Sequence, residues 1–311
     1  MSADNSPVTF EVVHTTEYAY SDTVSVSHHV ARLSPRALQT QTCLQHALEC
    51  DPEPAVQSSH RDYFGNHTTF FAMQGAHTHL TIRARSRVKV EAKPVPVFAE
   101  TCPWDAIAAD ESLPLDALEA RSSPFRIKPE FRAYAAPSFP AGRPVLEAVA
   151  ELTQRIYEDF TFDPKATTVT TALADVFRLR RGVCQDFARV EIACLRSLGL
   201  PALYISGYLE TSPPPGKPRR VGADASHAWL AVYCQDDGWI DVDPTNNLLP
   251  SNGHVTLAWG RDYSDVSPIR GVILGGGEHT LRVNVDVVRV PETDVGPLEP
   301  RTQDQGPQTD S

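Results

Sequence analysis

The chain has 311 residues, of which 41% are hydrophobic and 22% are charged, a composition ordinary for soluble globular proteins and a length sufficient for two domains. Its formal net charge of −11 argues against nucleic acid and against an anionic membrane as the main partner. No apolar run approaches the roughly 18 residues that a membrane-spanning helix needs, and residues 1–7 lack the features of a secretory signal, so we expect a cytoplasmic protein.

Residues 8–92 form the first predicted unit. Segments 10–20, 24–30 and 80–90 alternate with a period of two and are separated by turn residues, which predicts a β-sandwich-like antiparallel domain. Eight of the eleven histidines lie in this unit, but their spacing matches no common metal motif. We therefore predict no metal site.

Residues 93–143 are rich in proline, which breaks up long elements, so a connecting region with one short helix near 104–109 is predicted. A longer helix is predicted for 144–160, because its apolar residues fall on one stripe behind Pro144. We place the catalytic domain at 144–290.

Both ends of the chain are predicted to be disordered. This concerns residues 1–7 and residues 291–311, the latter being rich in proline, glycine, glutamine and acids with few apolar side chains.

Cys184 opens the next predicted helix. Apolar residues recur from Cys184 to Leu198 at intervals of three and four, and Gly199 and Pro201 end the pattern. A shorter helix at 171–181 leads into Gly182, which permits a sharp turn. The first turn of a helix has unpaired backbone amides and a favourable dipole, and both stabilise the thiolate, the reactive form of cysteine.

A hairpin is predicted after the strand 202–210. Residues 227–234 and 239–243 alternate, and Asp236-Asp237-Gly238 between them is typical of a turn. His227 and Asp243 both lie near its open end. A hairpin centred on Gln235 would set these two directly opposite each other, whereas a tight Asp237-Gly238 turn would not, so their pairing requires a longer or bulged loop.

Each of these residues also has an ordinary explanation. Cys184 alone could be a small buried hydrophobe, His227 a strand histidine, and Asp243 a turn former before proline. Asp241 lies on the same face as Asp243 and is an alternative partner for the histidine. Six cysteines without Cys-x-x-Cys spacing predict neither a zinc site nor a disulfide framework.

Together these segments resemble the transglutaminase-like superfamily of papain-like thiol enzymes, in the bacterial branch with its own β-rich N-terminal domain. The motifs concerned are Gly182-Val183-Cys184-Gln185-Asp186-Phe187-Ala188, Ser206-Gly207-Tyr208, Ser226-His227-Ala228-Trp229 and Asp243-Pro244-Thr245-Asn246, with Leu33-Ser34-Pro35-Arg36 and Phe64-Gly65-Asn66 in the N-terminal unit. The resemblance implies an α+β fold, in which the nucleophile helix packs on an antiparallel sheet behind the β-sandwich-like domain.

The resemblance also implies roles: Cys184 as nucleophile, His227 as general base and acid, and Asp243 as the residue that orients the imidazole. It implies no cofactor, and no acidic loop typical of a calcium site is evident. Arg189 stands where many relatives have histidine, a change that should affect the surroundings more than the chemistry.

The predicted activity is acyl transfer through a thioester on a peptide or protein substrate. Hydrolysis is favoured over transfer to an amine, and a non-catalytic peptide-binding module is the alternative of another class. The sequence identifies neither substrate-binding residues, nor a second oxyanion donor, nor the oligomeric state.

Overall fold

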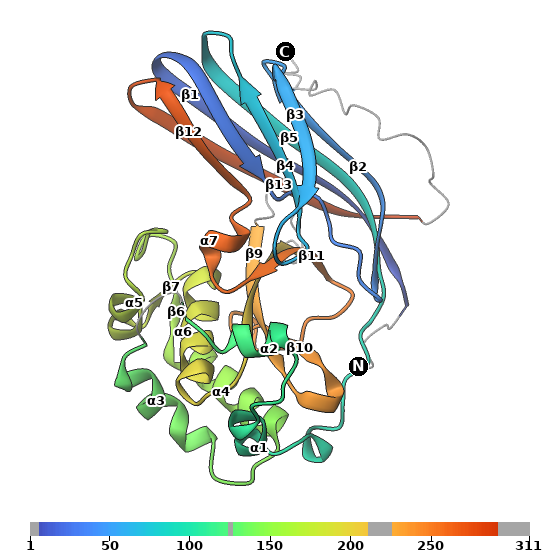
Figure 1. Ribbon diagram of the computed structural model, residues 1–311, viewed down its shortest axis with the longest axis vertical. Helices are drawn as coiled ribbons and strands as arrows, with labels where there is room; N and C mark the ends of the chain where they lie inside the picture. Colours follow the sequence, from blue (N-terminus) through green and yellow to red (C-terminus); the bar gives the residue numbers. More distant parts are fainter. Residues whose placement is uncertain (1–5, 124–126, 211–225, 292–311) are drawn as a thin grey trace, which may run out of the picture.

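A computed structural model describes residues 6–123, 127–210 and 226–291 (Figure 1). The predictions of disorder for the two ends of the chain fall almost entirely outside these ranges. In the described part of the chain, no helix is long and apolar enough to cross a membrane.

The N-terminal sheet is built along one 24-residue strand, β1 (Val8–Ala31). On one side β1 pairs with β5 (His77–Val90) and then with β4 (His67–Met73), and on the other with β13 (His279–Val290) and then with β12 (Ile269–Gly275). The outer strands are β2 (Gln41–Asp51), beside β5, and β3 (Val56–Arg61), beside β4. All these pairs are antiparallel.

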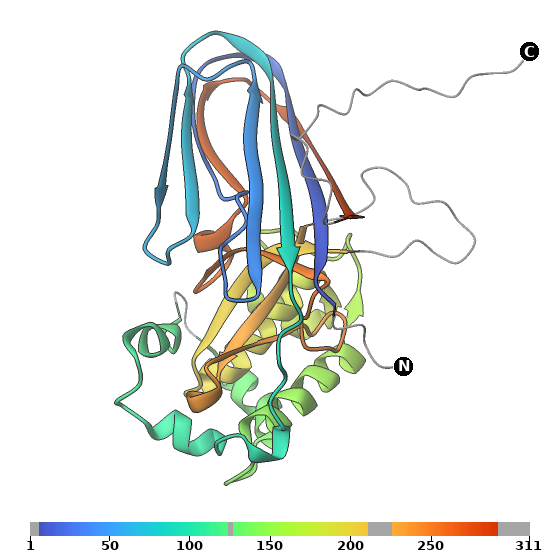
Figure 2. The ribbon, with the colours of Figure 1, turned by 90° about the vertical axis from the view of Figure 1, so that its right-hand side faces the viewer.

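This sheet is strongly curled. Its strands arch over at the end farthest from the helices (Figure 2). An apolar cluster is formed by side chains of these strands. The cluster includes Phe71, Leu80 and Ile82, and the last two belong to the alternating segment 80–90. The predicted antiparallel β-sandwich-like unit is therefore present.

The C-terminal limit predicted for the catalytic domain was wrong. We assigned residues up to 290 to the catalytic domain, but β12 and β13 pair with β1 and complete the N-terminal sheet. Sequence alternation marks a strand without showing which strand it pairs with, because that pairing joins residues more than 200 positions apart.

The catalytic part has a four-stranded antiparallel sheet in the order β10-β9-β8-β11. Its strands are β8 (Ala202–Leu209), β9 (Ser226–Tyr233), β10 (Trp239–Val242) and β11 (His254–Gly260). Helix α6 (Cys184–Ser197) packs on β8 and β9, as the α+β prediction requires. The helices α4 (Val145–Asp159) and α5 (Leu173–Leu179) join the same apolar core.

The remaining elements are short. They are η1 (Phe98–Glu100), η2 (Ala136–Ser138), β6 (Thr161–Phe162), β7 (Arg181–Gly182), η3 (Gln235–Asp237) and α7 (Tyr263–Val266).

The region predicted as a connection is part of the catalytic core. The predicted short helix is confirmed as α1 (Trp104–Ala109), and it is followed by α2 (Leu115–Ala120) and α3 (Pro129–Ala135). Ile107, Ala117 and Phe131 are buried in the cluster that contains α4 and α6. The predicted domain start at 144 is therefore too late, because prolines at helix starts were taken as signs of a linker.

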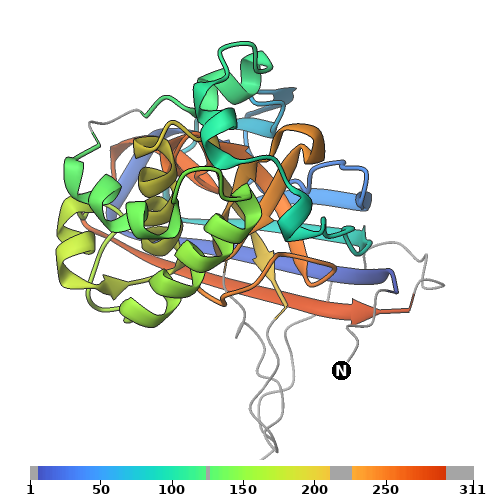
Figure 3. The same cartoon turned by 90° about the horizontal axis from the view of Figure 1, so that it is seen from below.

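The two sheets are joined by a second apolar cluster. Phe10, Val88 and Val287 of the N-terminal sheet pack against Tyr208 and Val255 of the catalytic sheet. From below, the helices lie in front of the long strands of the N-terminal sheet (Figure 3). The catalytic sheet thus has helices on one side and the N-terminal domain against β8 and β11.

Candidate active site

A fixed turn places Cys184 at the first position of α6. The Asp186 carboxylate accepts hydrogen bonds from the Val183 amide at 3.0 Å and from the Thr167 hydroxyl at 2.6 Å, which ties the chain entering the helix to its first turn. A Cβ atom on Gly182 would lie 2.4 Å from the same carboxylate, so only glycine fits there. Cys184 is partly exposed, as a nucleophile must be.

His227 and Asp243 are brought together by the hairpin of β9 and β10. Trp239 pairs with Tyr233, and continuing this register sets Asp243 against Trp229 rather than against His227. The loop between the strands is long and contains η3, which meets the requirement for a longer loop. The side chains then meet diagonally on one face, with His227 Nε2 2.7 Å from Asp243 Oδ2.

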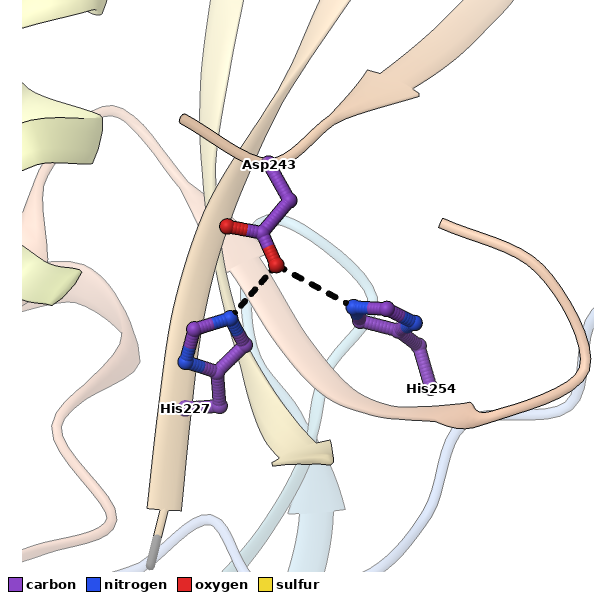
Figure 4. Close-up of side chains that lie close together, drawn as sticks. All are labelled: His227, Asp243 and His254. Carbon is purple, nitrogen blue, oxygen red and sulfur yellow. Dashed lines mark hydrogen bonds and ion pairs between the residues drawn. The ribbon is translucent and has the colours of Figure 1, made fainter. Parts of the chain in front are cut away.

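Cys184 lies close enough to His227 to interact with its imidazole and to favour its charged form. Because Nε2 faces Asp243, Nδ1 is the ring nitrogen left for the thiol (Figure 4). Burial alone would lower the pKa of His227, but the interactions with Asp243 and Cys184 raise it to about 9. The geometry therefore favours an imidazolium at neutral pH.

Asp243 is fully buried and remains a strong acceptor. Burial disfavours its charge, yet the hydrogen bonds from His227, His254 and Asn246 hold the pKa of its carboxyl well below the usual range.

Asp241, the alternative partner, belongs to another network. Its carboxylate accepts hydrogen bonds from Lys93 at 2.5 Å and from the Trp229 indole at 3.2 Å. No hydrogen bond between Asp241 and His227 is present in the described residues. Of the two aspartates, the geometry favours Asp243 as the partner of His227.

Two residues at this site were not assigned a role from sequence. Asn246 donates its side-chain amide to Asp243 Oδ2 at 2.7 Å, and His254 Nε2 lies 3.3 Å from the same oxygen (Figure 4). Asn246 stands inside the Asp-Pro-Thr-Asn motif, which was a usable signal. His254 is the first residue of β11, and no motif marked it.

The same groups form a possible metal-binding set. Ligand atoms of His227, Asp243 and His254 all lie within 4.8 Å of one another, and two imidazoles with a carboxylate are suitable zinc ligands. In this structure each imidazole is hydrogen-bonded to the carboxylate between them.

Arg189, the departure from the family pattern, forms an ion pair with Asp262. Its guanidinium binds the Asp262 carboxylate at 2.9 and 3.4 Å, and both side chains are largely buried. The residue thus links the nucleophile helix to the start of α7.

A cavity of about 660 Å³ lies between the two domains and is bordered by Arg32, Tyr63, Glu119 and Arg261. None of Cys184, His227 and Asp243 lines it. Its arginines are opposed by carboxylates, so its charge selects no particular ligand.

Two family models match the chain. The bacterial transglutaminase-like N-terminal region matches residues 10–89, and the transglutaminase-like superfamily matches residues 132–244. Cys184, His227 and Asp243 lie within the second match, and His254 lies outside it.

Several known proteins are similar to the chain. The uncharacterized protein Rv2569c of Mycobacterium tuberculosis (strain ATCC 25618 / H37Rv) is 42% identical over 306 residues, 93% of this chain and 97% of that protein. A protein-glutamine gamma-glutamyltransferase of Pseudomonas aeruginosa is 32% identical over 106 residues, but these are 33% of this chain and only 16% of that protein. A solved protein of Cytophaga hutchinsonii, described as a candidate cysteine protease, superposes with a TM-score of 0.72 at 20% identity, covering 92% of each chain.

The fold and the matches agree. The chain belongs to the transglutaminase-like superfamily, in the branch with the bacterial N-terminal region, and it has the papain-like cysteine protease type of fold.

Proposed function

We propose that the protein is a cysteine-dependent acyl-transfer enzyme that acts on peptide or carboxamide bonds. The observation that carries the proposal is His227, which is hydrogen-bonded to the buried carboxylate of Asp243 and interacts with Cys184 at the start of α6. An imidazolium held beside a thiol at a helix start favours the thiolate, and a thiolate attacks carbonyl carbons.

The chemistry follows from these positions. The Cys184 thiolate attacks the carbonyl carbon, and the Cys184 backbone amide at the helix start donates to the oxyanion. His227 gives its proton to the departing amine, which leaves a thioester on Cys184. Asp243 orients His227 throughout. A water molecule, activated by His227, then hydrolyses the thioester and restores the thiol.

Hydrolysis is the favoured outcome. Transfer to an amine needs a pocket that binds the acceptor and excludes water, whereas hydrolysis needs only a water molecule at the thioester. The partial similarity to a protein-glutamine gamma-glutamyltransferase makes transamidation the second candidate. The proposal includes a cytoplasmic location, which the six free thiols support.

A peptide-binding module without chemistry is the competing class. The test is labelling of the protein with iodoacetamide at pH 7, followed by mass spectrometry after incubation with candidate peptides, with and without an added amine. We expect fast labelling of Cys184, a trapped acyl-enzyme, and loss of both in Cys184→Ala. Cys102→Ala is the matched control, because Cys102 is also partly exposed but lies outside the site.

An unreactive Cys184, or peptide binding that survives Cys184→Ala with no acyl-enzyme in the parent protein, would identify a binding module instead. A product that carries the added amine would assign transamidation.

A further inference from the structure

The Asp243 carboxylate lies between two imidazoles, and only one of them takes part in the proposed reaction. Its oxygen Oδ2 accepts His227 Nε2 at 2.7 Å and His254 Nε2 at 3.3 Å (Figure 4). His254 is buried, with 7% of its surface exposed. Its link to the reacting groups is through the Asp243 carboxylate.

The other donors to the Asp243 carboxylate come from its own turn. The backbone amides of Thr245 and Asn246 bond Oδ1 at 2.9 and 3.3 Å, and the Asn246 side chain bonds Oδ2. These donors belong to the same turn as Asp243 and move with it. Two donors come from other elements, namely His227 on β9 and His254 on β11. Because His227 is the group that Asp243 orients, His254 is the donor that can hold the carboxylate in place.

The ring of His254 is held in place by its own surroundings. It meets the indole of Trp229 edge-on, with ring centroids 5.2 Å apart, and Trp229 in turn stacks on His227 at 5.9 Å. A Cβ atom on Gly207 would lie 2.4 Å from the Trp229 ring, so the indole has no room to move toward β8.

The strand that carries His254 is held by the N-terminal domain. The Gln41 side-chain amide makes two hydrogen bonds of 2.8 Å with the backbone of Thr256, as a neighbouring strand would. Asn66 does the same at Trp259, at 2.9 and 3.0 Å. Since β11 is an edge strand of the catalytic sheet, these side chains complete its hydrogen bonding.

We propose that His254 is a positioning residue, which holds the Asp243 carboxylate against His227 from a strand that the N-terminal domain fixes. The effect of His254 on catalysis rests on the proposed function. Its effect on the hydrogen-bonded pair of His227 and Asp243 does not. The titratable groups that face this pair are Cys184 and Glu191 on α6 and His254 on β11.

The test measures the pKa of His227 by NMR titration of the full chain, together with the pH dependence of Cys184 alkylation. In His254→Ala, Asp243 loses its external anchor, and we expect the pKa of His227 to fall by one unit or more. We expect alkylation at pH 8 to slow several-fold. His254→Gln keeps a donor and should restore most of the parent behaviour.

Val255→Ala is the control for a merely structural effect. Val255 is the next residue of β11, and its side chain lies in the interdomain core. This variant should lose stability without moving the pKa of His227. An unchanged pKa in His254→Ala would overturn the proposal, as would a raised pKa, which would mean that His254 only competes for Oδ2.

The proposed function fails by a different result. If Cys184 forms no acyl-enzyme in the parent protein, the enzyme assignment is lost, yet the NMR titration still decides the role of His254. An activity that EDTA abolishes and zinc restores would overturn the positioning role, because the same groups would then be metal ligands.

Discussion

The buried histidines of the two sheets have opposite electrostatic surroundings. In the N-terminal sheet, burial lowers the pKa of the buried His14 and His29 and of the half-buried His46 to about 4. In the catalytic sheet, His227 is also buried, yet its pKa is raised to about 9. His14 and His46 bond hydroxyl groups, and His29 has no hydrogen-bond partner among the described residues, whereas His227 bonds a carboxylate.

The comparison shows that burial alone does not create a reactive histidine. Loss of water penalises the charged imidazole in both sheets and lowers its pKa. Only an ionised partner turns this into a raised pKa. The carboxylate of Asp243 supplies that reversal because its own charge is stabilised by several donors. Where hydroxyls or aromatic rings surround the histidine, it remains neutral and serves only packing.

Replacing Asp243 should make His227 resemble the N-terminal histidines, which is the largest effect that we expect. In Asp243→Asn the imidazole loses its charged acceptor, so the pKa of His227 should fall below 6.5 and turnover should drop roughly 10³-fold or more. The measurements are kcat/KM at pH 7 and an NMR titration of His227.

Asp241→Asn is the matched control. It removes the same charge from the same face two residues away, but this carboxylate bonds Lys93 and Trp229. We expect lower stability with most of the turnover retained. Equal losses of turnover in the two variants would show that Asp241 is the orienting residue.

The local parts of the site could be predicted from the sequence. The helix that begins at Cys184 is confirmed, because its apolar spacing and its Gly-x-Pro stop are contained in about 20 consecutive residues. The His227 hairpin is confirmed for the same reason, although its register differs from either form considered.

The parts that depend on distant pairing could not be predicted. His254 reaches Asp243 because a ten-residue segment returns the chain. The choice between Asp241 and Asp243 depends on a diagonal contact across the hairpin, whose register is set by the loop that contains η3. The pairing of β13 with β1 left no local signal, because alternation is the same whichever sheet a strand joins.

The neutral histidines of the N-terminal sheet predict a loss of stability in acid. A histidine with a lowered pKa contributes stability that is complete above its unfolded pKa of about 6.5 and is lost as pH falls toward 4. His14→Gln keeps hydrogen-bonding atoms near Tyr208 and Thr16 but cannot be protonated. We expect it to reduce the acid-induced loss by up to about 3 kcal/mol, measured by urea unfolding at pH 7 and pH 4.5.

His227 should act in the opposite direction. Because its pKa is raised, its stabilising contribution is complete below about pH 6.5 and is lost as pH rises through about 9.

His28→Gln is the control for the His14→Gln measurement in acid, since His28 is exposed. If His14→Gln left the loss of stability between pH 7 and pH 4.5 unchanged, the explanation by burial of a neutral histidine would be contradicted.

Glu191 is the carboxylic counterpart of the neutral histidines. It lies on α6 two turns after Cys184, is fully buried, and accepts a 2.7 Å hydrogen bond from Thr153, while its second oxygen has no partner among the described residues. Burial raises its pKa to about 8, and the nearby charge of Asp243 adds to this effect. The group is therefore protonated in the folded protein at neutral pH.

A carboxyl with a raised pKa destabilises the folded state as pH rises, because the unfolded chain releases its proton from about pH 4.5 upward while the folded one retains it to about 8. Glu191→Gln removes this cost but leaves an amide hydrogen without an acceptor, which offsets part of the gain. We expect a net gain of about 2 kcal/mol at pH 8.5 and almost none at pH 4.5, measured by urea unfolding at both values. Because α6 keeps its packing, the rate of Cys184 alkylation should stay near that of the parent protein. A loss of stability at pH 8.5, or a gain of equal size at both pH values, would show that folding does not raise the pKa of Glu191, and the contrast between the neutral buried groups and the ionised pair of His227 and Asp243 would no longer hold.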